Sequence, residues 1–295
     1  MEIHVNDSTR GPWPQRLLLA TDLGARCDRP LDRAKQLALE WQSELLVLTV
    51  REGPRTPEEV ASWLDRDGAT QAFELAARRE LDEEFQGSPL SPSLRVVEGD
   101  VTDSILEVAA TLQDALVVTG ASSEGSFEQL MLGSTAERLA QDLVHPLLVV
   151  RQRTRGPYAR ILVANDFSAA SRRALEAACR MFPGRRIVLF HVLEALTEPV
   201  AGAVQEALEA SERFLDACAL PAGAREHVAT FIGHGSVTDT IPRYALEQAT
   251  QLVVLGVHPQ SGVTRMFMGS RSEDLLQHLA CDTLLVRSRE DRDDG

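Results

Sequence analysis

Short runs of leucine, valine and isoleucine alternate with longer segments of helical periodicity along the whole chain. In residues 28–41, for example, apolar side chains recur every three or four positions, which is typical of one face of a helix. We expect strands over residues 16–21, 44–50, 94–97, 115–119 and 146–151, and again over 160–164, 186–192, 227–232, 252–255 and 283–286. Helices are expected over residues 28–41, 71–85, 102–113, 134–143, 169–181, 200–218, 237–248 and 270–279. Apolar strands that alternate with helices predict a parallel sheet covered on both faces.

The same order of elements occurs twice because the sequence repeats itself. Residues Gly99–Ile105 reappear as Gly235–Ile241, an offset of 136 positions, and Leu18–Asp22 reappear as Leu162–Asp166, an offset of 144. The first copy therefore has the longer middle section. We predict two tandem domains, residues 1–153 and 157–295, with a linker at 154–156 and a disordered tail at 289–295.

Two strand orders suit five strand–helix units with right-handed crossovers. One is the flavodoxin-like order 2-1-3-4-5, and the other is the Rossmann-like order 3-2-1-4-5. We expect the second, so that each half is an open five-stranded parallel sheet with helices on both faces. Ligands of such sheets bind outside the carboxyl ends of strands 1 and 4, where the chain switches direction. This arrangement brings Asp22 close to Gly120, and Asp166 close to Gly256.

The acidic balance of the chain argues against nucleic acid and membranes as partners. The formal net charge is −14, which repels phosphate backbones and anionic lipid. Residues 1–155 carry 16 basic and 26 acidic side chains, a net −10, whereas residues 156–295 carry 14 and 18, a net −4. No apolar stretch approaches the ~20 residues that cross a bilayer, and the polar start shows no signal-peptide pattern. We therefore expect a cytoplasmic protein.

Few side chains suggest catalysis or metal binding. The four cysteines lie far apart without a Cys-x-x-Cys pair, and no cluster of His, Cys or Asp has ligand spacing. Lys35 is the only lysine, so a P-loop is absent, and no Gly-x-Ser-x-Gly motif occurs. We predict no catalytic residue and no metal ligand. Any bound phosphate must be held by arginine, backbone N–H groups or a metal.

The stretch after the fourth strand of the second half suits an anionic ligand. Gly256 ends the strand, where a glycine lets the backbone approach a ligand closely, and Gly269-Ser270 opens the next helix. The free N–H groups and positive dipole end of a helix start suit phosphate. Together with Asp166 after strand 1, this segment resembles the universal stress protein family. The resemblance spans nearly the whole chain, twice.

The resemblance implies a nucleotide site in each half. The family's nucleotide-binding members show Gly-x2-Gly-x9-Gly-Ser/Thr after strand 4, an aspartate after strand 1 and a valine after strand 2. In the second half, which we prefer, these positions are Asp166, Val192, Gly256, Gly269 and Ser270. In the first half they are Asp22, Val50, Gly120, Gly133 and Ser134. The resemblance implies ATP as the ligand, with Mg²⁺ as its companion ion.

Both copies depart from the motif at its second glycine, which is Ser123 in the first and Pro259 in the second. Proline has no N–H group and a fixed φ, so a phosphate contact there is lost or rearranged. The charges around the two loops also differ: Glu124 and Glu128 flank the first, and His258 and Arg265 flank the second. Because the second loop suits an anion better, we expect the second half to bind more strongly.

Simpler explanations stand beside these roles. Ser134–Glu137 and Ser270–Glu273 are capping boxes, which satisfy free N–H groups at a helix start without any ligand. Asp22 and Asp166 are also suited to turns. The leading function is a cytoplasmic, nucleotide-binding stress protein that acts as a sensor or signalling module. The alternatives are a nucleotide-free member that works through protein–protein contact, and a slow ATPase or transferase, for which no base or activated nucleophile is evident.

The last strand of each half lies at a sheet edge in the expected order. Leu147–Arg151 and Thr283–Arg287 are apolar except for a terminal arginine, and bare edges of this kind are normally covered. Family members that this chain resembles commonly pair domains through that strand. We predict that the two halves dock through it within one chain. Undocked domains, or pairing between chains in a homodimer, are the alternatives.

Overall fold

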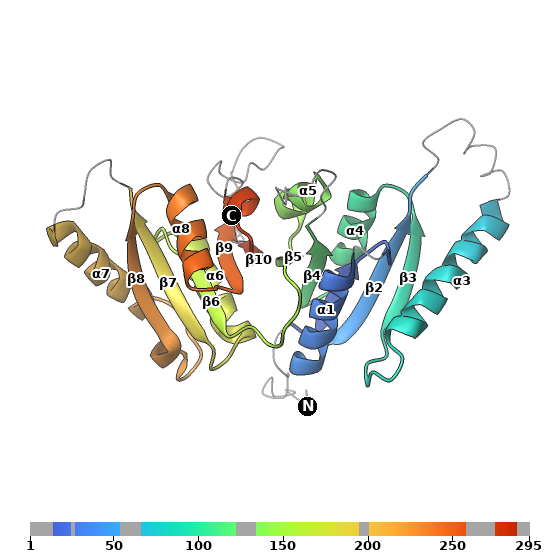
Figure 1. Ribbon diagram of the computed structural model, residues 1–295, viewed down its shortest axis with the longest axis horizontal. Helices are drawn as coiled ribbons and strands as arrows, with labels where there is room; N and C mark the ends of the chain where they lie inside the picture. The colour runs from blue at the N-terminus through green and yellow to red at the C-terminus, as the bar shows by residue number, and fades with distance from the viewer. Residues whose placement is uncertain are drawn as a thin grey trace, which may run out of the picture.

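The structure is a computed structural model that describes residues 14–24, 27–53, 66–121, 134–194, 201–257 and 275–287. Within these ranges, ten strands form one continuous sheet in the order β3-β2-β1-β4-β5-β10-β9-β6-β7-β8 (Figure 1). Each half has the order 3-2-1-4-5, which confirms the Rossmann-like arrangement over the flavodoxin-like one. None of the described helices is long and apolar enough to cross a membrane.

The elements of the first half follow the expected alternation. They are β1 (Arg16–Ala20), α1 (Asp28–Trp41), β2 (Glu44–Arg51), α3 (Arg66–Glu84), β3 (Ser93–Glu98), α4 (Val101–Ala110), β4 (Ala115–Gly120), α5 (Ser134–Asp142) and β5 (Leu147–Val150). The helix expected from residue 71 begins five residues earlier, so part of the longer middle section is helical. At the start of α4, the Asp100 side chain accepts a hydrogen bond from the N–H of Asp103, which caps the helix.

The second half repeats this order. Its elements are β6 (Arg160–Ala164), α6 (Ala169–Met181), β7 (Arg186–Leu193), α7 (Ala201–Asp216), η3 (Ala224–His227), β8 (Val228–His234), α8 (Val237–Glu247), β9 (Leu252–Val257) and β10 (Asp282–Arg287). Of the helix expected over 270–279, the structure describes residues 275–278 as helical. The strand expected at 227–232 is preceded by the short 3₁₀ helix η3, which follows the left-handed turn residue Gly223.

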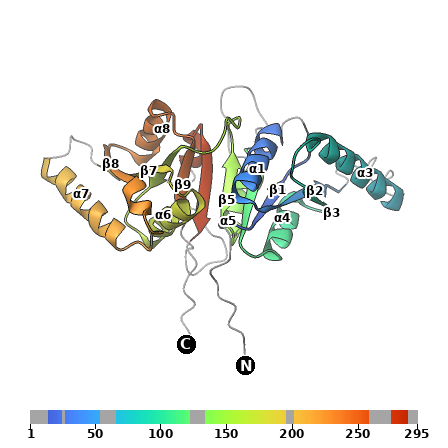
Figure 2. The same cartoon turned by 90° about the horizontal axis from the view of Figure 1, so that it is seen from below.

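Helices cover both faces of the sheet, and each apolar layer draws on both halves. One buried cluster includes residues of α1, α3, α6 and α7, and the other includes residues of α4, α5 and α8. Figure 2 shows the helices on the two sides of the strands. The edge strands of the described sheet are β3 at one end and β8 at the other.

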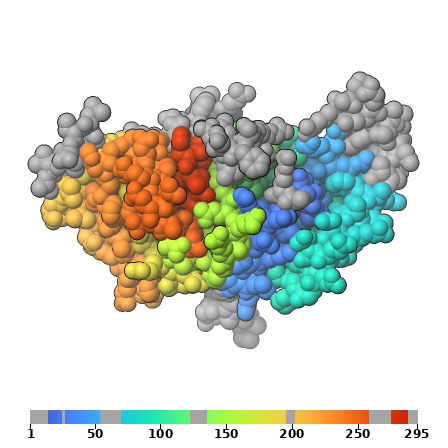
Figure 3. Space-filling view, in the orientation of Figure 1, coloured from blue at the N-terminus to red at the C-terminus, as the bar shows by residue number. Residues whose placement is uncertain are grey.

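The two halves meet through their last strands, as predicted from the bare edges. β5 and β10 pair antiparallel, with Val149 opposite Thr283 and Leu147 opposite Leu285, whereas the pairs within each half are parallel. All four residues of β5 are buried, so the edge that the sequence left apolar is covered. The space-filling view shows the two halves in contact along this seam (Figure 3).

The arginines that end the two seam strands reach across it. Arg287 donates to the carbonyl oxygen of Leu143 at 2.7 Å, and Arg151 donates to that of Leu276 at 2.6 Å. Because each satisfies a carbonyl group of the opposite half, these arginines help to hold the halves together.

A buried carboxylate lies at the centre of the seam. Asp282 is fully buried and accepts hydrogen bonds from the N–H groups of Arg151 and Gln152, at 2.7 and 2.9 Å, and from the hydroxyl of Tyr158 at 2.6 Å. The Nε atom of Arg33 lies 3.5 Å from the Asp282 carboxylate. The Cζ atom of the same guanidinium group lies 3.9 Å from the centre of the Tyr158 ring. A buried charge is tolerated only when it is paired and hydrogen-bonded in this way.

Candidate functional site

In each half, the carboxyl ends of the first and fourth strands are neighbours, as the strand order requires. β1 pairs with β4 in the first half, and β6 pairs with β9 in the second. Asp22 follows β1 while Gly120 ends β4, and Asp166 follows β6 while Gly256 lies near the end of β9. The expected residues therefore gather at one edge of the sheet in both halves.

The loop after β1 is a turn held by its own side chains. The Thr21 hydroxyl accepts a hydrogen bond from the N–H of Leu23 at 3.0 Å, and Asp22 accepts one from the N–H of Gly24 at 2.8 Å. The Cys27 thiol also donates to Asp22, at 2.9 Å. Short polar side chains of this kind stabilise turns by bonding to the backbone two residues on.

The loop after β6 is built in the same way. Asn165 accepts from the N–H of Phe167 at 2.9 Å, and Asp166 accepts from the N–H of Ser168 at 3.0 Å. Phe167 has a φ of 63°, and Leu23, at the matching position, has a φ of 57°. Both aspartates thus serve the turn, which is the simpler of the two roles that the sequence allows. A second role towards a ligand stays a prediction.

Asn165 is a polar residue of this edge that the sequence analysis missed. It is 6% exposed, and its side-chain oxygen accepts from the Ser171 hydroxyl at 3.1 Å. Its backbone oxygen contacts the ring nitrogen Nδ1 of His191 at 2.8 Å, and that ring packs against Phe167. The amide nitrogen of Asn165 has no hydrogen-bond partner within the described part of the chain. The offset of 144 aligns Asn165 with Thr21, and this recurrence of a polar residue was the available signal.

The two glycines differ in the space around them. A Cβ atom added to Gly256 would lie 2.7 Å from the backbone nitrogen of Ser171 and still closer to the carbonyl group of Ala170. At Gly120, an added Cβ would meet Pro30 at 3.4 Å, which is ordinary contact. Gly256 is therefore required by the close approach of α6 to β9, whatever the ligand.

The valines lie beside the same edge. Val50 lies near the end of β2, opposite Val97 of β3, and Val192 lies near the end of β7, opposite Gly233 of β8. Val192 is 8% exposed, and Val50 is half-buried. Both lie beside the turn after the first strand, and their contact with a ligand stays a prediction.

The glycine–serine loops fall outside the described residues. These are Gly133, Gly269 and Ser270, with the departures Ser123, Glu124, Glu128, His258, Pro259 and Arg265. Ser134 is described only as the first residue of α5. The contacts that would hold a phosphate in either half therefore remain predictions.

No described group of three or more His, Cys, Asp or Glu side chains is arranged to hold a metal ion. Burial raises the pKa of the Cys27 thiol, which keeps it protonated as a donor to Asp22.

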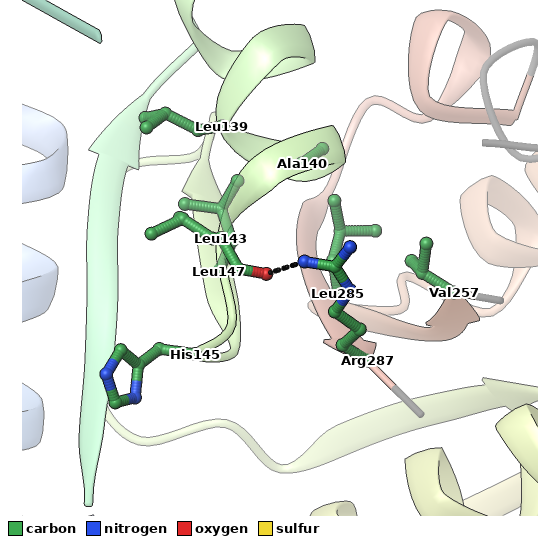
Figure 4. A pocket seen from close by; sticks show the side chains of 8 residues that line it. All are labelled: Leu139, Ala140, Leu143, His145, Leu147, Val257, Leu285 and Arg287. Carbon is green, nitrogen blue, oxygen red and sulfur yellow. Dashed lines mark hydrogen bonds between the residues drawn. The ribbon is translucent and has the colours of Figure 1, made fainter. Parts of the chain in front are cut away.

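A small hollow at the seam, with a volume of about 10 Å³, has room for about one water molecule (Figure 4). Its walls are Leu139, Ala140, Leu143, His145, Leu147, Val257, Leu285 and Arg287. It is too small for a nucleotide.

Comparisons with known proteins place both halves in one family. The model of the universal stress protein family matches residues 14–151 and again residues 157–287. A universal stress protein of Mycolicibacterium smegmatis is 33% identical over 198 residues, which are 62% of this chain and 66% of that relative. The match thus spans just under two thirds of the relative's length.

Two solved structures have the same fold over nearly the whole chain. A universal stress protein of Archaeoglobus fulgidus matches with a TM-score of 0.68 at 19% identity, covering 93% of this chain and 98% of its own. A Pseudomonas aeruginosa protein that carries the family's name matches with a TM-score of 0.64 at 19% identity, covering 92% and 93%. Because the family model matches both halves of the sequence, the chain belongs to the universal stress protein family, as two of its domains in tandem.

Proposed function

We propose that the chain binds an adenine nucleotide, ATP, at the carboxyl edge of its sheet, and acts as a cytoplasmic sensor or signalling module rather than an enzyme. One observation carries the proposal. In both halves, a polar residue and an aspartate form the same turn directly after the first strand, beside a fourth strand that ends at a glycine. This is the switch point at which parallel sheets bind ligands.

The second half is the stronger candidate. Asn165 brings to its edge a buried amide donor without a hydrogen-bond partner among the described residues, whereas Thr21 stands at that position in the first half. A buried donor that is left unsatisfied costs free energy, so a ligand that accepts its hydrogen bond gains that amount. His258 and Arg265, which lie between the motif positions in the sequence, add positive charge or donors to the same loop.

The described residues fit a magnesium nucleotide better than a free metal ion. One carboxylate, Asp22 or Asp166, directly follows the first strand of each half, and among the described residues no group of three or more His, Cys, Asp or Glu could hold a metal ion. Mg²⁺ is usually held by one or two carboxylates together with substrate phosphates and water. In this proposal, Asp166 helps to hold the ion only when the phosphates are present.

Calorimetric titration of ATP and Mg²⁺ into Asp166→Asn and Asp22→Asn tests the proposal. Asparagine keeps the side-chain oxygen that the turn uses but removes the charge, so each variant is expected to fold. We expect Asp166→Asn to weaken ATP binding at least tenfold and Asp22→Asn to have the smaller effect. If only Asp22→Asn weakens binding, the halves are assigned wrongly. Mass spectrometry of ligand released from gently purified protein gives the nucleotide's identity.

The second candidate is a nucleotide-free member that acts through protein contacts. Pro259 favours it, because a proline in the place of the motif's second glycine has no N–H group to offer a phosphate. Wild-type protein that shows no heat and no thermal shift with millimolar ATP, and releases no nucleotide, would establish this candidate instead.

A further inference from the structure

The two halves hold the end of their outermost helix in different ways. In the first half, the Lys35 ammonium on α1 bonds to Glu84, the last residue of α3, through the carboxylate at 2.9 Å and the carbonyl oxygen at 2.6 Å. The offset of 144 places Cys179 of α6 at the position of Lys35. In the second half, α7 takes the place of α3 in the order of elements. The repeat therefore directs Cys179 towards the end of α7.

A second cysteine lies at that end. Cys218 follows Asp216, the last residue of α7, by two positions. Beside it, the N–H of Ala219 donates a hydrogen bond to the Glu176 carboxylate at 2.9 Å. Glu176 lies three residues before Cys179 on α6. Because residues three apart lie on the same face of a helix, this bond holds the Cys218 turn against the face of α6 that carries Cys179.

Both side chains belong to the buried cluster that α6 and α7 share. Cys179 is 2% exposed within this cluster, and the half-buried Cys218 packs against it. The Cys218 thiol donates to the carbonyl oxygen of Phe214 at 3.1 Å, and Phe214 is itself a member of the cluster. All four cysteines of the chain lie among the described residues, and each is a free thiol.

The pKa values of the two thiols reflect their shared surroundings. Burial above all, together with the charge of Glu176, raises the pKa of each to about 11. The charge of Cys218 also raises the pKa of Cys179. By contrast, no second thiol is among the groups that shift the pKa of Cys27 or Cys281. Because little thiolate is present at neutral pH, both thiols react slowly and stay reduced until an oxidant persists.

We propose that Cys179 and Cys218 form a reversible disulfide when the protein meets a hydroperoxide. The more exposed sulfur, that of Cys218, attacks as a thiolate: an S–O bond forms, the O–O bond breaks, and an alcohol or water leaves. The Cys179 thiolate then attacks the sulfenic sulfur, and the S–O bond breaks to release water. Two thiols thus lose two protons and two electrons, which reduce one hydroperoxide to one alcohol and one water.

The chain around Cys218 suits such a bond. A disulfide needs Cα atoms about 4.4–6.8 Å apart. Cys218 lies beyond the last helical residue of α7, so its backbone can adjust without breaking that helix. The closed bond fixes α6, whose first turn lies against Gly256, to the end of α7. The inference does not depend on nucleotide binding.

Peptide mapping of the full chain tests the proposal. Folded protein is treated with hydrogen peroxide, its remaining thiols are blocked in denaturant, and trypsin cuts after arginine. We expect residues 174–180 and 214–225 as a linked pair of peptides that dithiothreitol separates. A double variant, Cys27→Ser with Cys281→Ser, is the matched control and is expected to form the same bridge. Folded wild-type protein that forms no such bridge, or that forms it faster in urea, overturns the proposal.

Dimedone, which traps sulfenic acids, tests the order of attack. In Cys179→Ala, we expect peroxide to leave a dimedone adduct on Cys218, because no second thiol removes the sulfenic acid. In Cys218→Ala, the buried Cys179 is expected to be labelled at least tenfold less. Equal labelling of the two variants, or labelling of Cys179 alone, overturns the proposed step. The mapping of the wild-type chain decides the bridge itself even if a variant fails to fold.

Discussion

The hydroxyl of Tyr158 donates a 2.6 Å hydrogen bond to Asp282, and both side chains are buried at the seam between the halves. Tyr158 lies just before β6, and Asp282 begins β10, so the bond ties the start of the second domain to the strand that joins the first. Burial raises the pKa of Tyr158 well above its ordinary value, and the charge of Asp282 raises it further. The tyrosine therefore stays a donor.

Tyr158→Phe is expected to lower the free energy of unfolding by about 1–3 kcal/mol. The variant keeps the ring that packs on Arg33 and Phe182, but it removes one hydrogen bond from a carboxylate that has no access to water. Tyr244→Phe, at the other tyrosine of the chain, is the matched control and is expected to change stability by less than about 0.5 kcal/mol. Urea denaturation measures both, and equal losses would contradict the role given to Asp282.

Stability is expected to fall as the pH rises above 9. Burial raises the pKa of the Cys281 thiol to about 12, and the charge of Asp282 adds to this effect. In the unfolded chain the thiol titrates near its ordinary value, so between pH 9 and pH 12 the unfolded state binds fewer protons than the folded state. Each such group lowers stability by up to ~1.4 kcal/mol per pH unit. Denaturation curves at pH 8 and pH 10.5 measure how far the free energy of unfolding falls between these two pH values. We expect a smaller fall for Cys281→Ala than for wild type, and an equal fall in both would refute this cause.

Gly256→Ala is expected to be far more disruptive than Gly120→Ala. The added methyl group at position 256 overlaps the backbone of Ala170 and Ser171, so the first turn of α6 must move away from β9. Overpacking of this kind costs about 1–3 kcal/mol or more. At position 120 the methyl group meets only Pro30, at contact distance. Thermal unfolding of the two variants compares them, and similar melting temperatures would show that α6 can shift freely.

Turnover of ATP is expected to be negligible. Phosphoryl transfer needs a metal, positioned cations and a group that orients the attacking water or hydroxyl. At the described part of the edge, the aspartates, Thr21 and Asn165 hold the turns and the His191 ring contacts the backbone of Asn165. The motifs read from the sequence assign no residue to orient the attacking group. Phosphate release should stay below about one per minute over a mock preparation. Faster release that Gly269→Val abolishes would overturn the assignment as a binding module.

Much of the fold could be predicted from the sequence because its signals are local or repeated. Buried strands alternating with helices indicate the parallel sheet, and the bare Leu147–Arg151 edge indicates the seam. The network around Asp282 could not be predicted, since its partners lie more than one hundred residues away and meet only once the strand register is known. Likewise, the sequence marks Gly256 as a motif residue but does not show that Ala170 lies against it.

At the seam, the two copies of the repeat carry different residues at matching positions. At the offset of 136, Asp282 corresponds to Pro146, and at the offset of 144, Arg33 corresponds to Ala177. In a homodimer of identical domains, every substitution occurs on both sides of the axis, so an acid and its arginine cannot be divided between partners in this way. In a single chain the two sides of the seam can differ, so Arg33 of the first half pairs with Asp282 of the second. A second domain without the first would lack this arginine.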